Sequence, residues 1–240
     1  MKGRKLNISP MLMMLILLIV TRLIRNGMTD PMEWISDRLV MLPAILVGLS
    51  LHEFGHAIVS DKLGDPTPRL QGRVTISPLA HVDPMGLLCL IFAGFGWGRP
   101  VQIDPTYYKH RRRDEAMTAV AGVTMNLIIA IVSTLIIKII VQMAPTFLDS
   151  TVGEVIIEIL QYMIYINIVL MFFNLIPVPP LDGFNIITQI FDLRKYSWYY
   201  TFSSYGGIIL LLIVLFGGTS YILGPLVRSL YNICISFITA

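Results

Sequence analysis

The chain has 240 residues, of which 55% are hydrophobic and only 14% are charged, and its mean hydropathy is +0.73. A soluble domain typically carries about 25% charged residues, so this composition excludes a soluble monomer. The net charge of +3 is small, and the basic residues are interspersed with apolar runs, which gives no reason to expect a nucleic-acid partner. Cys89 and Cys234 both lie in apolar segments, so neither a disulfide framework nor a cysteine zinc site is available.

Long runs without Asp, Glu, Lys or Arg predict a multi-pass membrane protein, because about 20 residues of helix cross a bilayer. The N-terminal run follows a basic segment, as in a signal peptide. However, Arg22 and Arg25 stand where a cleavage site with small residues would be expected, so we interpret this run as a retained helix. The sequence predicts six membrane helices, near residues 8–24, 39–61, 114–143, 153–177, 197–217 and 221–238.

The segment between the second and third predicted helices is different. Residues 85–97 form an apolar piece of only 13 residues with three glycines, which favours a re-entrant segment over a span. Proline-rich sequence surrounds it, and residues 70–77 resemble a short strand edge with which an extended substrate could pair. We therefore expect an all-α polytopic fold with a short re-entrant or strand-like region.

One membrane-embedded domain is expected over residues 1–240, because no polar stretch is large enough for a second domain. Its core is expected at about 39–185, with three peripheral helices at 8–24, 197–217 and 221–238.

The distribution of basic residues predicts the orientation. If six helices alternate, 13 of the 18 Lys and Arg residues fall on the side of both termini, of residues 62–113 and of residues 178–196. The positive-inside rule places that side in the cytoplasm. We therefore expect a multi-pass protein of the cell membrane, with both termini and the access to its site on the cytoplasmic side. The cluster Lys109 to Arg113 is interpreted as this orientation signal, with a grip on an acidic substrate flank as the alternative.

The second predicted helix contains His52-Glu-Phe-Gly-His56, an H-E-x-x-H motif. Histidines four residues apart project from one face of a helix, so both imidazoles can bind one Zn²⁺. Glu53 is then placed to take a proton from metal-activated water. Ionisable groups inside a membrane helix are costly and usually functional, so we interpret these three residues as the centre of a zinc site.

A catalytic zinc site needs a third protein ligand. His81 and His110 are poor candidates because both lie in loop-like sequence. Asp182 is the better candidate, because the preceding Pro177-Val-Pro-Pro180 should unwind the fourth helix. At about 1.5 Å per residue, the motif histidines lie about 8 and 14 Å from the inner end of their helix, and Asp182 lies toward the same side.

Asn126 lies within the third predicted helix, about 18 Å from its inner end and close in depth to His52. Its amide could hydrogen-bond a substrate carbonyl or a developing oxyanion. It could equally join two helices, with Gly122 allowing close packing. The residues themselves leave both interpretations open.

Four sequence blocks resemble the site-2 protease family of intramembrane zinc metalloproteases. They are His52 to His56, His81-Val-Asp-Pro-Met-Gly86, Gly96-Trp-Gly-Arg-Pro-Val-Gln-Ile-Asp-Pro105, and Asn174 to Gly183. The resemblance implies one zinc ion per chain, held by His52, His56 and Asp182. It also implies that Glu53 is the general base and that Asn126, together with Asn174 in the last block, contacts the substrate.

The resemblance implies hydrolysis of a peptide bond in or near a transmembrane segment of a membrane-protein substrate, by a minimal form without PDZ or CBS domains. Two alternatives remain. One is an inactive protein that only binds membrane partners, against which the intact Glu53 argues. The other is a zinc transporter, which is disfavoured because a transport path needs several acidic or histidine groups on facing helices.

Overall fold

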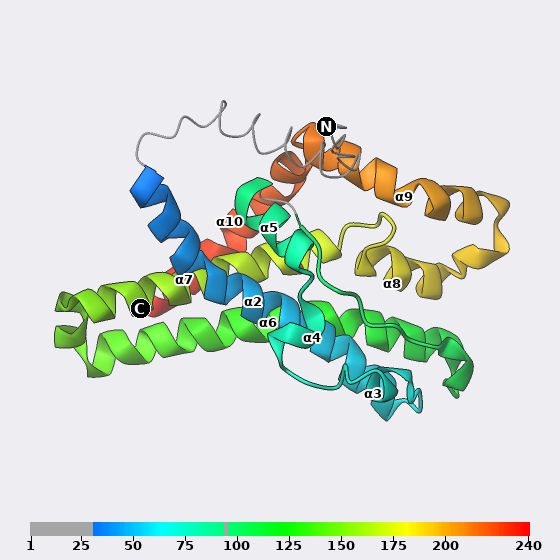
Figure 1. Cartoon of the computed structure of the whole chain (residues 1–240), viewed down its shortest axis with the longest axis horizontal. Coiled ribbons are helices and arrows are strands. Elements are labelled where there is room, and N and C mark those ends of the chain that lie inside the picture. Colours follow the sequence, from blue (N-terminus) through cyan, green and yellow to red (C-terminus); the bar gives the residue numbers. More distant parts are fainter. Residues whose placement is uncertain (1–30, 94–95) are drawn as a thin grey trace, which may run out of the picture.

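The structure, a computed structural model, describes residues 31–93 and 96–240, so the predicted helix at 8–24 lies outside the described residues. The described part is built from helices and connecting loops (Figure 1). The α-helices are α2 (Pro31–Lys62), α3 (Thr67–Leu70), α4 (Pro78–His81), α5 (Pro84–Ala93), α6 (Arg111–Met143), α7 (Thr151–Asn174), α8 (Asp182–Phe191), α9 (Ser197–Leu215) and α10 (Gly218–Thr239), and the 3₁₀ helices are η1 (Pro105–Tyr107), η2 (Pro145–Asp149) and η3 (Leu193–Lys195).

Five of these helices are long and apolar enough to cross a membrane, namely those at Met32–Lys62, Arg111–Met143, Thr151–Asn174, Ser197–Leu215 and Gly218–Thr239. This confirms the prediction of an all-α polytopic membrane protein. α7 ends at Asn174, three residues before Pro177, because a proline restricts the residue before it and cannot donate to a helix.

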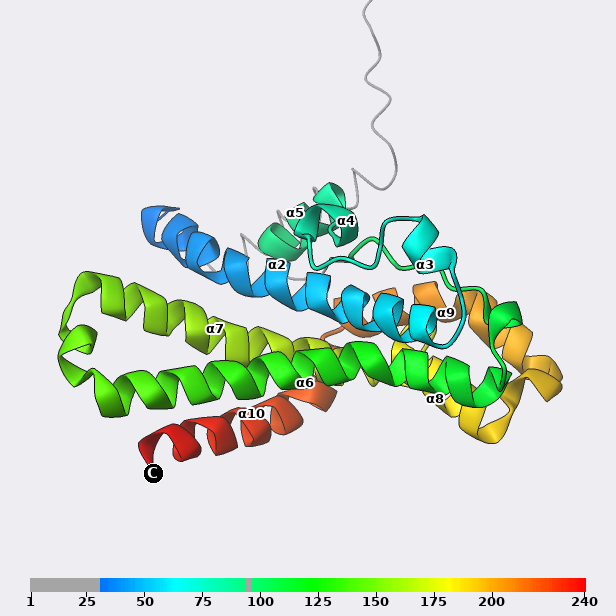
Figure 2. The ribbon, with the colours of Figure 1, turned by 90° about the horizontal axis from the view of Figure 1, so that it is seen from below.

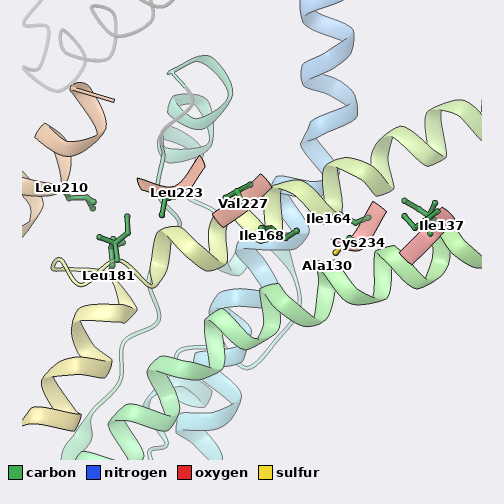
Figure 3. Packing of buried hydrophobic residues seen from close by; sticks show 11 residues of the cluster. Ala130, Ile137, Ile164, Ile168, Leu181, Leu210, Leu223, Val227 and Cys234 are labelled. Atoms are coloured by element: carbon green, nitrogen blue, oxygen red, sulfur yellow. The ribbon is translucent and has the colours of Figure 1, made fainter. Parts of the chain in front are cut away.

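Four helices, α2, α6, α7 and α10, pack in three layers. α2 lies across the antiparallel pair of α6 and α7, and α10 packs against the other side of that pair (Figure 2). Small and branched side chains fill the contact between α6, α7 and α10, as Figure 3 shows for Ala130, Ile168 and Val227. The pair of α6 and α7 is thus a middle layer that separates α2 from α10.

The region between α2 and α6 differs from the prediction in one respect. Residues 70–77 form no strand, because α3 ends at Leu70 and Gly72 turns the backbone at φ +67°. Within residues 31–93 and 96–240, β pairing is confined to one antiparallel bridge between Val82 and Gly98. α5 has 10 residues, about 15 Å of helix, which is half the thickness of the hydrocarbon core.

The C-terminus also lies elsewhere than predicted. Lys138, near the end of α6, donates a hydrogen bond to Phe237 O at 2.9 Å. The end of α10 therefore lies beside the connection between α6 and α7, not on the side of residues 62–113 (Figures 1 and 2). The reason lies in the packing of the last two helices. α9 packs against η3, and after the turn at Gly217 α10 packs against α6 and α7, so each helix lies along a different half of the bundle.

This placement predicts a labelling pattern. In a chain with Cys89→Ser and Cys234→Ser, single cysteines introduced by Ala240→Cys and Asp149→Cys should react with a membrane-impermeant maleimide from the same side. Lys109→Cys should react from the opposite side. If Ala240→Cys were instead labelled together with Lys109→Cys, the described position of α10 would be wrong.

Candidate metal centre

His52 and His56 lie where α2 comes very close to α6. A Cβ atom added to Gly122 of α6 would lie 2.7 Å from His52 Cε1 and 2.5 Å from His56 Cε1. One added to Gly55 of α2 would lie 2.9 Å from Ala121 O. Real Cβ atoms do not approach other atoms so closely, so the two glycines create the space that the imidazoles and the facing backbone occupy.

Asp182 completes a compact group with the two histidines. Its Oδ2 lies 3.3 Å from His52 Nε2 and 3.3 Å from His56 Nε2, and the two Nε2 atoms are 3.1 Å apart. Asp182 is the first residue of α8, reached by a loop so tight that a Cβ at Gly183 would collide with Leu175 O. The structure thus brings together the three residues that the sequence predicts as ligands.

The hydrogen bonds on the far side of each imidazole fix where the protons lie. His52 Nδ1 is 2.7 Å from Asn126 Oδ1, and His56 Nδ1 is 2.7 Å from Thr118 O. Both partners are acceptors, so each neutral imidazole carries its proton on Nδ1 and presents a lone pair at Nε2. A carbonyl partner on the second ring nitrogen is the arrangement found for metal-bound histidines.

The Nε2 lone pairs of the two imidazoles and the carboxylate of Asp182 face one another and repel, and a bound cation would remove this repulsion. Asp182 Oδ2 is buried without a hydrogen-bond partner. Histidine nitrogens with one carboxylate oxygen match the donors that Zn²⁺ accepts in catalytic sites. These residues therefore fit a zinc ion, and their ligand atoms lie within 4.8 Å of one another.

Asn126 is fully buried, and its amide is engaged by the protein on every side. Its oxygen accepts from His52, while its Nδ2 lies 3.2 Å from Gly48 O and 2.9 Å from Asn167 Oδ1. Asn167 is also fully buried and in turn donates to Met163 O at 2.8 Å. The described contact of Asn126 is thus with a ligand histidine. Sequence reasoning missed Asn167, although an amide within a charge-free run was a usable signal.

Glu53 faces an extended segment of the loop between α5 and α6. Its Oε2 accepts a hydrogen bond from the backbone N–H of Val101 at 2.9 Å. This leaves the second carboxylate oxygen for other partners. No side-chain type marks a backbone donor, so sequence reasoning had no signal for Val101.

The block from His81 to Gly86 holds that segment in place. Arg99 N donates to His81 O at 2.6 Å, next to the bridge between Val82 and Gly98. The imidazole of His81 is buried and donates through Nε2 to Thr75 O at 2.7 Å. His81 is therefore outside the metal group, as the sequence predicted, and supports the loop instead.

The N-terminal end of α6 anchors α8. Arg112 Nη2 donates to Gln189 O at 2.7 Å and to Ile190 O at 3.0 Å. The buried Glu115 accepts from Gln189 Nε2 at 2.6 Å and from Arg194 Nη1 at 3.1 Å. These contacts fix the helix that begins at Asp182, and they engage one arginine of the predicted basic cluster with the chain itself.

A second buried network ends near His56. Tyr108 OH lies 2.7 Å from Ser60 Oγ and 3.1 Å from Thr118 Oγ1. Ser60 Oγ donates to the fully buried Asp65 at 2.8 Å. The network joins α2, the loop before α6, and the residue whose carbonyl orients His56.

Two other candidates have simpler surroundings. Asn174 is the last residue of α7, and its Nδ2 donates to Leu170 O at 2.9 Å, so contact with a substrate stays a prediction. His110 is exposed before α6, as expected for a loop residue.

The close packing at Gly122 makes a testable prediction. Gly122→Ala should displace both imidazoles and weaken zinc binding by about 10- to 100-fold or more, the usual effect of disturbing the support of metal ligands. The measurement is zinc content per chain and competition with a chelator. Gly207→Ala is the matched control, because nothing lies within 4 Å of a Cβ there. Unchanged zinc affinity in Gly122→Ala would contradict the described packing.

The Asp65 network predicts a pH dependence of stability. Burial alone would raise the pKa of Asp65, but hydrogen bonds from Thr67, Asp104 and Ser60 hold this pKa below its ordinary value. Stability from such a carboxylate is present above its unfolded-state pKa and is lost as the pH falls through the lower folded-state pKa. Asp65→Asn should therefore lower the free energy of unfolding by about 1.5–3 kcal/mol at neutral pH.

The difference between Asp65→Asn and the wild type should shrink as the carboxyl becomes protonated below pH ~4. Thermal unfolding of the metal-free proteins in detergent at a series of pH values measures it. A difference that stays constant with pH would show that the ionised carboxylate contributes nothing.

Known proteins resemble this chain across the site. The sequence profile of peptidase family M50 matches residues 40–215. The Bacillus subtilis protein "Putative zinc metalloprotease YwhC" is 33% identical over 189 residues, covering 77% of this chain and 84% of that protein. "Putative zinc metalloprotease Rip2" of Mycolicibacterium smegmatis is 26% identical over 163 residues, covering 65% of this chain and 59% of that protein.

The protein of the same name from Mycobacterium tuberculosis is 27% identical over 161 residues, or 65% of this chain and 58% of that protein. No solved structure shows a significant match. The family profile covers most of the chain and includes all three members of the His-His-Asp group. The chain therefore belongs to peptidase family M50, the site-2 protease family.

Proposed function

We propose that this chain is a zinc-dependent intramembrane endopeptidase that hydrolyses a peptide bond in or near a transmembrane segment of another membrane protein. The observation that supports it best is the compact group of the buried His52 and the half-buried His56 and Asp182, with Glu53 next to His52 on an apolar helix. The family of the chain and the names of its relatives agree with a zinc metalloprotease. Neither alternative function gains a specific observation in its favour.

The depth of the group supports cleavage within the membrane. The charge-free run of α6 extends over residues 116–137, and Asn126, which contacts His52, is near its middle. The segment from Lys109 to Arg113 lies to one side of this level, at the N-terminal end of α6, and carries four basic residues. The proposal therefore includes access for water from that side, with that side in the cytoplasm by the positive-inside rule.

In this proposal His52, His56 and Asp182 hold one zinc ion per chain. When bound, zinc supplies Lewis acidity, which acidifies water and polarises a peptide carbonyl. Glu53 is the general base: it takes a proton from the attacking water and returns that proton to the leaving amine. The Val101 N–H holds one oxygen of Glu53, which keeps the carboxylate oriented while the second oxygen moves the proton.

The buried amides keep the ligands in a single arrangement. Asn126 and Thr118 hold the histidine protons on Nδ1, so neither imidazole has to rotate or exchange tautomers to bind the metal. We assign Asn126 this positioning role, with substrate contact as its second predicted role, shared with Asn174. The substrate must lose its own helical hydrogen bonds locally, since a bond inside a helix is shielded.

The first test measures zinc and cleavage together. A synthetic transmembrane peptide with a central Gly-Gly and a fluorophore–quencher pair is incorporated with the purified full chain into phosphatidylcholine vesicles. The wild type should hold about one zinc and cleave the peptide. Glu53→Gln should keep its zinc and lose roughly 10²- to 10⁴-fold in rate, because only the proton transfer is removed.

Three variants complete this test. His56→Ala and Asp182→Ala should lose both zinc and cleavage. Glu154→Gln is the matched control, because this carboxylate is exposed at the start of α7, away from the site, and the rate should not change. Zinc-loaded wild type that cleaves no faster than Glu53→Gln would overturn the proposal in favour of a binding protein.

A further inference from the structure

The exposed side of α10 carries a row of polar side chains. Its buried side consists of Leu223, Val227, Cys234 and Ile238. At the helical spacing of three, four and seven residues, one exposed edge is polar, and we call it the α10 polar stripe: Tyr221, Arg228, Ser229, Asn232 and Ser236. A membrane helix whose outer side meets only lipid should not carry such a row, because polar residues in membrane helices almost always face protein or water.

Arg228 lies near the middle of the membrane. Lys138 ends the charge-free run of α6 and so marks the membrane border, and it hydrogen-bonds Phe237 O on α10. Arg228 is nine residues before Phe237, about 13 Å along the helix. The hydrocarbon core is about 30 Å thick, so the guanidinium starts close to the midplane. Basic residues near the ends of membrane helices can extend their side chains to the membrane surface. Arg228 is central in α10 (Gly218–Thr239), so its side chain is too far from the surface to do so.

The part of the chain that the structure describes offers Arg228 no counter-charge. Within the described ranges, no hydrogen bond or ion pair joins the Arg228 side chain to another residue. Glu53 and Asp182 belong to the site beside α2, on the far side of the middle layer from α10. Residues 1–29 contain no Asp or Glu, so a helix formed there could not supply a carboxylate at mid-membrane depth.

We propose that the α10 polar stripe is a docking surface for a transmembrane helix of another membrane protein that carries one Asp or Glu near its middle. A carboxylate at that depth would pair with Arg228, and Ser229 and Asn232 would supply further hydrogen bonds between the helices. Such pairing is how charged residues inside membranes are usually satisfied. Anionic lipid headgroups lie at the surface, about 15 Å away.

The position of the α10 polar stripe indicates that the docked helix belongs to a partner protein and not to a substrate. α10 lies on the side of α6 and α7 opposite to α2, whereas the histidines lie between α2 and α6 (Figure 2). A helix docked on α10 is therefore separated from the metal group by the middle layer and is not placed for cleavage. A second copy docked by two-fold symmetry would bring Arg228 against its own counterpart, which is repulsive.

The test uses binding in vesicles and needs no enzymatic activity. The full chain carries a donor dye at Ala240→Cys in the Cys89→Ser and Cys234→Ser background. It is reconstituted in phosphatidylcholine vesicles with an acceptor-labelled 24-residue Leu-Ala transmembrane peptide that has one central Glu. The comparison peptide has Gln at that position. Energy transfer should show roughly tenfold tighter binding of the Glu peptide.

Variants identify the arginine as the cause. Arg228→Leu should abolish the preference for Glu, and Arg228→Lys should keep part of it. Lys138→Leu is the matched control, because this cation already has its partner in Phe237, and the preference should persist. Equal binding of both peptides, or a preference that survives Arg228→Leu, would overturn the proposal. Energy transfer between copies that is lost in Arg228→Leu would assign the stripe to self-association instead and also overturn it.

Discussion

The contact between α2 and α6 at Gly122 is the constraint on which the site depends. The two imidazoles occupy the volume that any larger residue at position 122 would fill. Apolar side chains gain little from meeting each other in lipid, so membrane helices associate through small residues and hydrogen bonds. The crossing of α2 and α6 has small residues as well as hydrogen bonds. Gly55 and Gly122 let the two backbones approach, and the histidines of α2 form hydrogen bonds to α6.

Buried amide groups near the site are hydrogen-bonded from one helix to the next. His52 donates to Asn126, Asn126 to Asn167, and Asn167 to a backbone carbonyl of α7. An unbonded polar group in an apolar interior costs several kcal/mol by order of magnitude, so this chain of bonds stabilises three helices as it fixes one ligand. Asp182 Oδ2 is left without a bond in the same place. A cation at the site would therefore give this oxygen the partner that the surrounding side chains do not supply.

The sequence predicted those features that depend on residues close together in the chain. The H-E-x-x-H spacing and the charge-free runs predicted His52, Glu53 and His56 as site residues, and the proline-rich break predicted Asp182; the structure brings His52, His56 and Asp182 together. The groups that orient them were less visible, because the Thr118 carbonyl and the Val101 N–H are backbone atoms that every residue possesses. Strand-like alternation misled at residues 70–77, where a glycine turn decides the backbone, and counting spans misplaced the C-terminus, because it ignores how α9 and α10 pack.

The three predicted ligands are held with different degrees of constraint. His52 and His56 share α2, and each imidazole is also hydrogen-bonded to α6, so two helices fix their position. Asp182 arrives on a separate segment, which Arg112 and Glu115 attach to α6 and which Phe184 joins to α9 by stacking on Tyr199.

A metal ion that binds all three side chains cross-links α2 to α8 across α6, and its binding energy then stabilises the fold as well as the site. The segment that carries Asp182 also connects the centre to α9. A displacement of α9 would therefore act on the site through Asp182, whereas hydrogen bonds to α6 hold the two histidines.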